Sequence, residues 1–116
     1  MINLQVDEGY AFDYLSILFV KKNKNTETNN IKSWQNCFEY LKHQINNTEL
    51  WNKIIESEEM KKIIDANEKT FEAVEKARYG EISAKQVDDC NMERYNAKVR
   101  LQNKFFPNSL IIEKKS

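Results

Sequence analysis

The chain has 116 residues, of which 41% are hydrophobic, and its 18 basic and 18 acidic side chains balance. This length suits one small domain, over residues 1–116, and excludes two. Without a net charge there is no long-range field to attract a polyanion or an acidic membrane surface, so we expect neither nucleic acid nor a membrane as a partner.

Segment lengths and cysteine spacing exclude further classes. The longest apolar run, residues 17–20, is far too short to span a bilayer, and the N-terminus lacks the basic and apolar segments of a secretory signal. Cys37 and Cys90 are far apart and belong to no Cys/His grouping, so we expect reduced, half-buried thiols rather than a zinc site. We therefore expect a cytoplasmic protein with no metal or cofactor.

Both ends of the chain contain short β-prone segments. Residues 2–6 alternate apolar and polar side chains, which predicts a short strand or an extended arm. Residues 110–112 form a second β-prone run that could pair with the first, although two such segments alone are marginally stable.

The first predicted helix begins after Asp7, a favourable N-cap residue, and continues through Lys22. Apolar residues surround most of its circumference, so we expect it at the centre of the fold. Asp13 lies among these apolar residues, where a carboxylate needs a partner.

A polar loop over residues 23–30 separates this helix from the next. Over residues 31–45 the apolar side chains are spaced three and four residues apart, which predicts an amphipathic helix. His43, the only histidine, belongs to the polar side of this helix and is expected to be a solvated surface residue.

The next predicted helix begins with Thr48 as its cap and bends near Ser57. It continues to Gly80, which can adopt the left-handed conformation that ends helices. Asn67 is the polar residue in the middle of its apolar stripe.

Ser83 and Gln86 have the spacing of a capping box, which is the strongest local signal in the chain. The last long helix, over residues 87–106, follows this box and stops before Pro107. These elements together predict an all-α fold, a small bundle of four to five helices.

Three of these helices carry polar side chains on otherwise apolar faces, and we expect the faces to converge on one polar cluster. Arg94 would pair there with Asp13 and could also reach Glu75, because a guanidinium binds carboxylates through two parallel hydrogen bonds. The candidate site consists of Asp13, Asn67, Glu75, Asn91, Arg94 and Lys98.

Three interpretations of this cluster remain open. It is a buried network that fixes helix register, a pocket in which Arg94 and Lys98 bind a small anion, or a set of residues that simply face water. A chorismate-mutase-like enzyme would use Arg94, Lys98 and Gln102, but it also needs basic residues from other helices, for which only Lys21 and Lys22 are candidates. Glu72 and Glu75 share a face, as in helical nucleotide hydrolases, but a second acidic pair is not evident. We name no catalytic residue.

Four motifs follow one another along the chain, and each is short. Their residues are Gly9, Asp13, residues 15–18, Val20 and Lys21; Asn67, Phe71 and Glu75; Asn91, Arg94 and Lys98; and residues 113–116. Together they resemble a family of small, mainly helical bacterial proteins, a domain of unknown function often encoded near glycosyltransferases. Tyr10 departs from the acidic residue, and Phe71 from the tryptophan, that this family often has. The resemblance implies an accessory part in surface-glycan metabolism and gives no reaction.

The sequence therefore predicts a non-enzymatic accessory or interaction protein whose polar cluster is mainly structural. The alternative is a small-anion or metabolite-binding bundle. The partner would be another protein or a small anionic ligand. A homodimer is also expected, because the chain has more large apolar side chains than so small a bundle can hide, among them Trp34, Trp51, Phe105 and Phe106.

Overall fold

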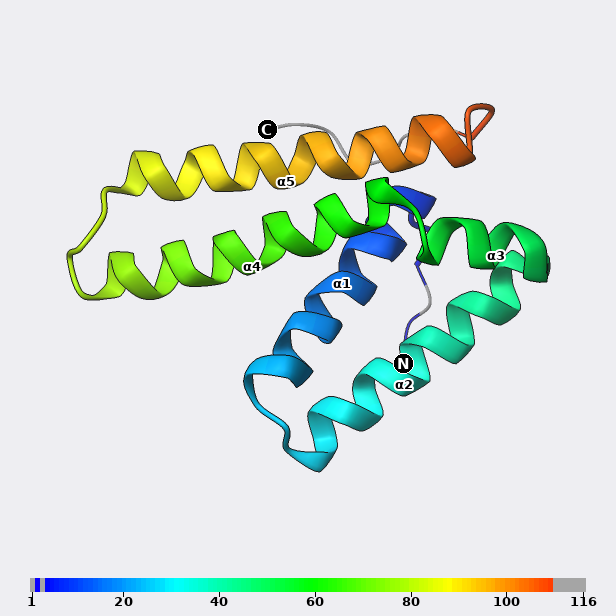
Figure 1. The fold of residues 1–116 in the computed structure, drawn as a ribbon, viewed down its shortest axis with the longest axis horizontal. Coiled ribbons are helices and arrows are strands. Elements are labelled where there is room, and N and C mark those ends of the chain that lie inside the picture. Colours follow the sequence, from blue (N-terminus) through cyan, green and yellow to red (C-terminus); the bar gives the residue numbers. More distant parts are fainter. Residues whose placement is uncertain (1, 3, 110–116) are drawn as a thin grey trace.

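The computed structural model describes residues 2 and 4–109, and these residues form five helices. The helices are α1 (Glu8–Lys24), α2 (Thr28–Ile45), α3 (Thr48–Ile55), α4 (Glu58–Arg78) and α5 (Ala84–Phe105) (Figure 1). The prediction of an all-α bundle is confirmed. None of the helices in the described residues is long and apolar enough to cross a membrane.

The predicted N-terminal strand is absent from the described residues. Residues 2 and 4–6 have no regular secondary structure, and the side chains of Leu4 and Val6 are exposed. A strand needs a neighbour for its backbone hydrogen bonds. Its predicted neighbour, residues 110–112, lies outside the described residues, so the expected pairing is not observed among them.

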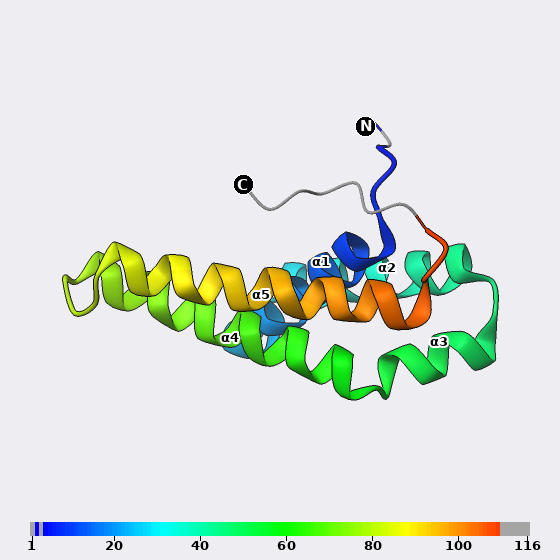
Figure 2. The same cartoon turned by 90° about the horizontal axis from the view of Figure 1, so that it is seen from above.

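The helix α1 lies at the centre and packs against α2, α4 and α5. The helices α4 and α5 form a long hairpin and lie side by side in two perpendicular views (Figures 1 and 2). The short helix α3 connects the hairpin of α1 and α2 to that of α4 and α5 (Figure 1). A central position agrees with the apolar side chains around most of α1, since such a helix must be covered on several sides.

The core is aromatic where α1, α2 and α3 meet. The centre of the Trp51 ring lies 5.7 Å from that of the Phe12 ring and 5.0 Å from that of the Phe38 ring. Trp51 and Phe38 meet edge to face. Aliphatic side chains of α3, α4 and α5 complete the core, among them Ile54, Ile63 and Leu101, each 0% exposed. Large aromatic rings remove much apolar surface from water, so this junction holds the two hairpins together.

Ser57 separates α3 from α4, at the predicted bend. Its hydroxyl accepts a hydrogen bond from the Met60 backbone N–H (3.1 Å) and donates one to the Ile54 carbonyl oxygen (2.6 Å). The same side chain thus adds a hydrogen bond to a carbonyl at the end of α3 and satisfies a backbone N–H group at the start of α4.

The helices α3 and α5 each begin at an N-cap residue whose side chain accepts a backbone hydrogen bond. The prediction that Thr48 caps α3 is wrong: Asn47 is the N-cap, and its side chain accepts from the Leu50 backbone N–H at 3.0 Å. The chain leaves α2 through Asn46 in the left-handed conformation, so the extended residue before α3 is Asn47. The predicted capping box of Ser83 and Gln86 is confirmed at the start of α5.

Candidate functional site

The centre of the site is an ion pair between α1 and α5. The Asp13 carboxylate is 2% exposed, and the Arg94 guanidinium donates to it through Nε (3.1 and 3.2 Å to the two oxygens) and Nη2 (2.8 Å to Oδ2). The Arg94 side chain is 29% exposed, so it reaches the carboxylate from the surface of the bundle. This fork geometry is the strong form of a charge-assisted hydrogen bond.

Asn67 joins α4 to the same pair. Its side-chain amide donates to Asp13 Oδ1 at 2.9 Å and to the hydroxyl of Ser16 at 3.0 Å. Asn67 and Ser16 are both buried. Across the described residues, no fully buried side-chain nitrogen or oxygen atom lacks a hydrogen-bond partner. The site therefore links α1, α4 and α5 through groups that satisfy one another.

Lys98 and Gln102 extend the contact between α5 and the first turn of α1. The Lys98 side chain is 4% exposed, and its ammonium lies 5.8 Å from the Tyr10 ring and 5.3 Å from the Tyr95 ring. The buried Gln102 accepts from the Gly9 backbone N–H and donates to the Glu8 carboxylate at 3.1 Å. The face of α5 that carries Arg94 is thus covered by α1.

The close approach of the two helices depends on Gly9. A Cβ atom at this position would lie 3.0 Å from both the Cγ and the backbone carbonyl oxygen of Lys98. Such a distance is shorter than normal van der Waals contact, so a side chain at this position would force Lys98 or the helix α1 to shift by a few tenths of an ångström.

Two predicted members do not join the cluster, and this part of the prediction is corrected. Asn91 is exposed, because it lies one turn before Arg94, toward the end of α5 that extends past α1 (Figure 1). Glu75 is also exposed, and its carboxylate lies 3.9 Å from Arg78 on the next turn of α4. The structure therefore brings together Asp13, Asn67 and Arg94, with Lys98 beside them.

Ser16 is not among the residues predicted from the sequence, but its hydroxyl accepts a hydrogen bond from Asn67 and so belongs to the polar cluster. Its position could have indicated this role, because a residue three positions after Asp13 lies on the same helix face. A serine in an apolar helix has a simpler explanation as a small core residue, so spacing alone did not single it out.

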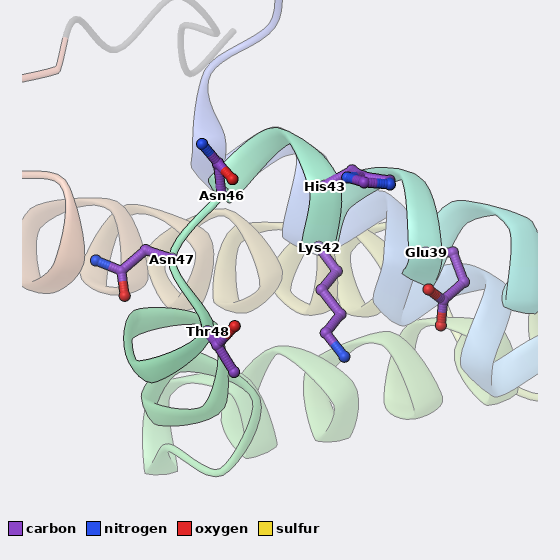
Figure 3. Close-up of a pocket in the computed structure, with 6 residues that line it drawn as sticks. All are labelled: Glu39, Lys42, His43, Asn46, Asn47 and Thr48. Atoms are coloured by element: carbon purple, nitrogen blue, oxygen red, sulfur yellow. The ribbon is translucent and has the colours of Figure 1, made fainter.

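A polar pocket of about 250 Å³ lies where α2 turns into α3. Its lining residues are Glu39, Lys42, His43, Asn46, Asn47 and Thr48 (Figure 3). All six are exposed, and the side chains of Asn46 and Asn47 point away from that of Lys42 (Figure 3). The only histidine is thus a surface residue, as predicted, and its neighbours do not converge on a common ligand position.

Two titratable side chains outside the cluster are perturbed. Burial raises the pKa of the Cys37 thiol above its ordinary value, because the thiolate loses hydration there. A hydrogen bond from Lys104 (2.7 Å) lowers the pKa of Glu59, which favours its carboxylate form. We assign no catalytic role to either group.

The cluster around Asp13 can hold α1, α4 and α5 in a fixed orientation, because its polar side chains are hydrogen-bonded to one another. Within residues 2 and 4–109, no group of three or more His, Cys, Asp and Glu side chains is placed to hold a metal ion. No protein-family model, curated protein or solved structure matches this chain. What the site does therefore has to follow from its own geometry.

Proposed function

We propose that the protein is a non-enzymatic accessory protein that acts by binding other protein chains, and that its polar cluster is structural. The observation that carries the proposal is the pairing within the cluster: Asp13, 2% exposed, accepts hydrogen bonds from both Arg94 and Asn67. An anion that replaced Asp13 as the partner of Arg94 would have to displace a buried carboxylate, and breaking a buried pair costs roughly 3–5 kcal/mol.

The neighbouring positions on α5 support the same conclusion. Lys98 and Gln102, which an anion site or a chorismate-mutase-like site would need, are 4% and 1% exposed under the first turn of α1. The Gln102 amide is already bonded to Gly9 and Glu8. Ligand binding here would require α1 to move away from α5.

A thermal-shift screen tests this part of the proposal. We expect malate, ATP and glucose 6-phosphate at millimolar concentration to leave the Tm unchanged, since a ligand raises Tm only if it binds the folded state. A rise of several degrees with any of these probes that disappears in Arg94→Lys would overturn the structural role of the cluster. Circular dichroism on Arg94→Lys provides the check that the variant is folded.

The surface for protein binding is proposed to be a groove beside the N-terminal segment. This groove of about 410 Å³ is lined by Leu4, Gln5, Val6, Glu8, Ala11, Phe12, Tyr40, Leu41, Gln44 and Ile45. Leu4 is 79% exposed and Tyr40 58% exposed on its edges. Contiguous exposed apolar side chains around a concave surface are typical of protein interfaces, and we propose that a second copy of the chain binds here to form a homodimer.

Light scattering coupled to size-exclusion chromatography tests the dimer. We expect a dimer at high micromolar concentration and a shift toward monomer in Tyr40→Glu, because a carboxylate at the edge of the groove would have to be desolvated in the interface. Tyr79→Glu is the matched control, since Tyr79 is 73% exposed at the far end of α4. A monomer at all concentrations, or equal effects of both variants, would contradict the proposed surface.

We place this accessory role in surface-glycan metabolism on the basis of the motifs around Gly9, Asn67 and Arg94, and we keep the cytoplasm as its proposed location. These motifs resemble those of small bacterial proteins encoded near glycosyltransferases. A sugar-transferring enzyme is therefore the first heterologous partner to test, by co-purification with wild type and with Tyr40→Glu.

A further inference from the structure

A third concavity lies between the two hairpins, and its lining is apolar, unlike that of the polar pocket and of the groove. It has a volume of about 210 Å³ and is lined by Leu15, Phe19, Trp34, Phe38, Ile55, Met60 and Ile64. All seven side chains are apolar or aromatic, and they come from α1, α2, α3 and α4. It shares no lining residue with the groove of the proposed dimer.

The arrangement of the helices explains this cavity. The buried side chains of Leu15 and Met60 form part of its lining, whereas Trp34, Phe38 and Ile64 are only half-buried. The helices α2 and α4 both pack on α1, which lies between them, and their axes run in different directions (Figure 1). The aromatic residues of α2 therefore face a space that the chain does not fill.

One cation lies beside the cavity. The Lys22 ammonium is 4.6 Å from the centre of the Phe19 ring and 4.8 Å from that of the Trp34 ring, and both rings line the cavity. Among the described residues it donates a hydrogen bond to the side chain of Asn23 at 2.9 Å. A lysine ammonium carries three donors, so an anionic group above these rings would find a positive charge with donors beside it.

We propose that this cavity binds a small amphiphilic anion, whose apolar body lies among the α1, α2 and α4 side chains and whose carboxylate meets Lys22. The size fits, because an apolar cavity of about 150 Å³ already admits benzene. The apolar lining selects a hydrocarbon or aromatic body, and the ammonium selects an anionic head over a neutral or cationic one. This inference goes beyond the proposed role in protein binding, and binding here does not depend on the dimer.

Three probes with one apolar body test the proposal: 3-phenylpropanoate, 3-phenylpropan-1-ol and 3-phenylpropan-1-amine. Titration followed by the indole N–H resonance of Trp34 in two-dimensional NMR reports binding at the cavity itself. We expect the carboxylate to bind about fivefold more tightly than the alcohol, as for a partly solvated ion pair, and the amine to bind most weakly.

Matched variants distinguish the contribution of the Lys22 charge to binding from that of the apolar cavity. In Lys22→Met the carboxylate should lose its advantage over the alcohol, whereas Lys21→Met, which removes an exposed lysine next in the chain, should keep it. Ile64→Phe should weaken all three probes at least tenfold, because the larger ring occupies the space; Ile55→Phe serves if that variant does not fold.

Two results would overturn the proposal. One is the absence of any shift of the Trp34 resonance with all three probes in the folded wild-type protein. The other is a carboxylate preference that survives in Lys22→Met, which would place the anion elsewhere. The oligomeric state, measured on the same samples, tells these failures apart from a failure of the proposed dimer.

Discussion

Arg94 and Asp13 form a charge pair in which only one member reaches solvent, since the side chains are 29% and 2% exposed. Substitutions of the two residues should therefore lower the free energy of unfolding by different amounts. Arg94→Met leaves a carboxylate buried without its cation, and we expect it to lower the free energy of unfolding by about 3–5 kcal/mol. Asp13→Asn leaves a guanidinium that can turn to water, and we expect a loss of about 1–2 kcal/mol.

Urea denaturation of both variants measures this difference. Arg78→Met is the control, because the Arg78 pair with Glu75 is exposed and should change stability by less than about 0.5 kcal/mol. The double variant Asp13→Asn/Arg94→Met should lose less than the sum of the single variants, since the two side chains are in contact. Additive losses would mean that the observed ion pair does not couple the two residues.

Gly9 is a second position at which a small change, the addition of one Cβ atom, should alter the stability of the fold. We expect Gly9→Ala to destabilise the protein by about 1–2 kcal/mol, because the clash with the Lys98 carbonyl exceeds the gain of about 0.5–1 kcal/mol that alanine gives in a helix. Gly80 is the contrasting glycine: it has open space around it and a φ of 72°, so Gly80→Asn should be tolerated. Thermal unfolding of the two variants measures the difference, and a stabilising Gly9→Ala would contradict the close approach of α1 and α5.

At the scale of elements, Lys104 near the end of α5 is bonded to Glu59 in the first turn of α4. Since Lys104 lowers the pKa of Glu59 in the folded state, the pair stabilises the fold above the unfolded-state pKa of about 4.3. This contribution is lost as the pH falls through the lower folded-state pKa. We expect Glu59→Gln to be less stable than wild type at pH 7 and equally stable at the acidic end of a denaturation series from pH 7 to pH 2.

The control for this series is Glu58→Gln. Glu58 is exposed and lies 3.3 Å from Lys61 within α4, so its substitution does not affect the contact between helices. A stability difference between Glu59→Gln and wild type that stays constant over the whole pH range would show that the carboxylate charge is not its cause.

At the scale of the whole molecule, packing is concentrated at one end of the long hairpin. Ala73 is the last buried residue of α4 and Ala97 the first of α5, so residues 74–96 contain no buried side chain. This part of the hairpin extends beyond α1 (Figure 1). Regions with few buried apolar contacts open locally without global unfolding.

Native-state hydrogen exchange should show this gradient along α4 and α5. We expect amides of residues 76–90 to exchange at least about tenfold faster than those of residues 60–67 and 97–102, which carry the buried side chains of the core. Amides of residues 12–20 in α1 are the internal reference, since that helix is covered on several sides. Equal protection along the full hairpin would contradict the gradient.

Local signals in the sequence determined most of the helices of this protein. Asp7, Gly80 and the box of Ser83 and Gln86 end or begin helices as predicted, because a cap acts on backbone groups within a few residues of itself. Ser57, at the predicted bend, begins a separate helix. Asn47 is the exception, since two adjacent residues could both cap α3 and the left-handed turn at Asn46 decides between them.

The tertiary structure alone decided which polar side chains meet. Asp13, Asn67 and Arg94 come together because α1 crosses the hairpin at their level, while Asn91, with the same periodicity as Arg94, lies beyond the end of that contact. Helical periodicity gives the face of a residue but not how far along its helix a neighbour extends. The cavity beside Trp34 has the same origin, because it depends on the different directions of two helices rather than on the composition of either.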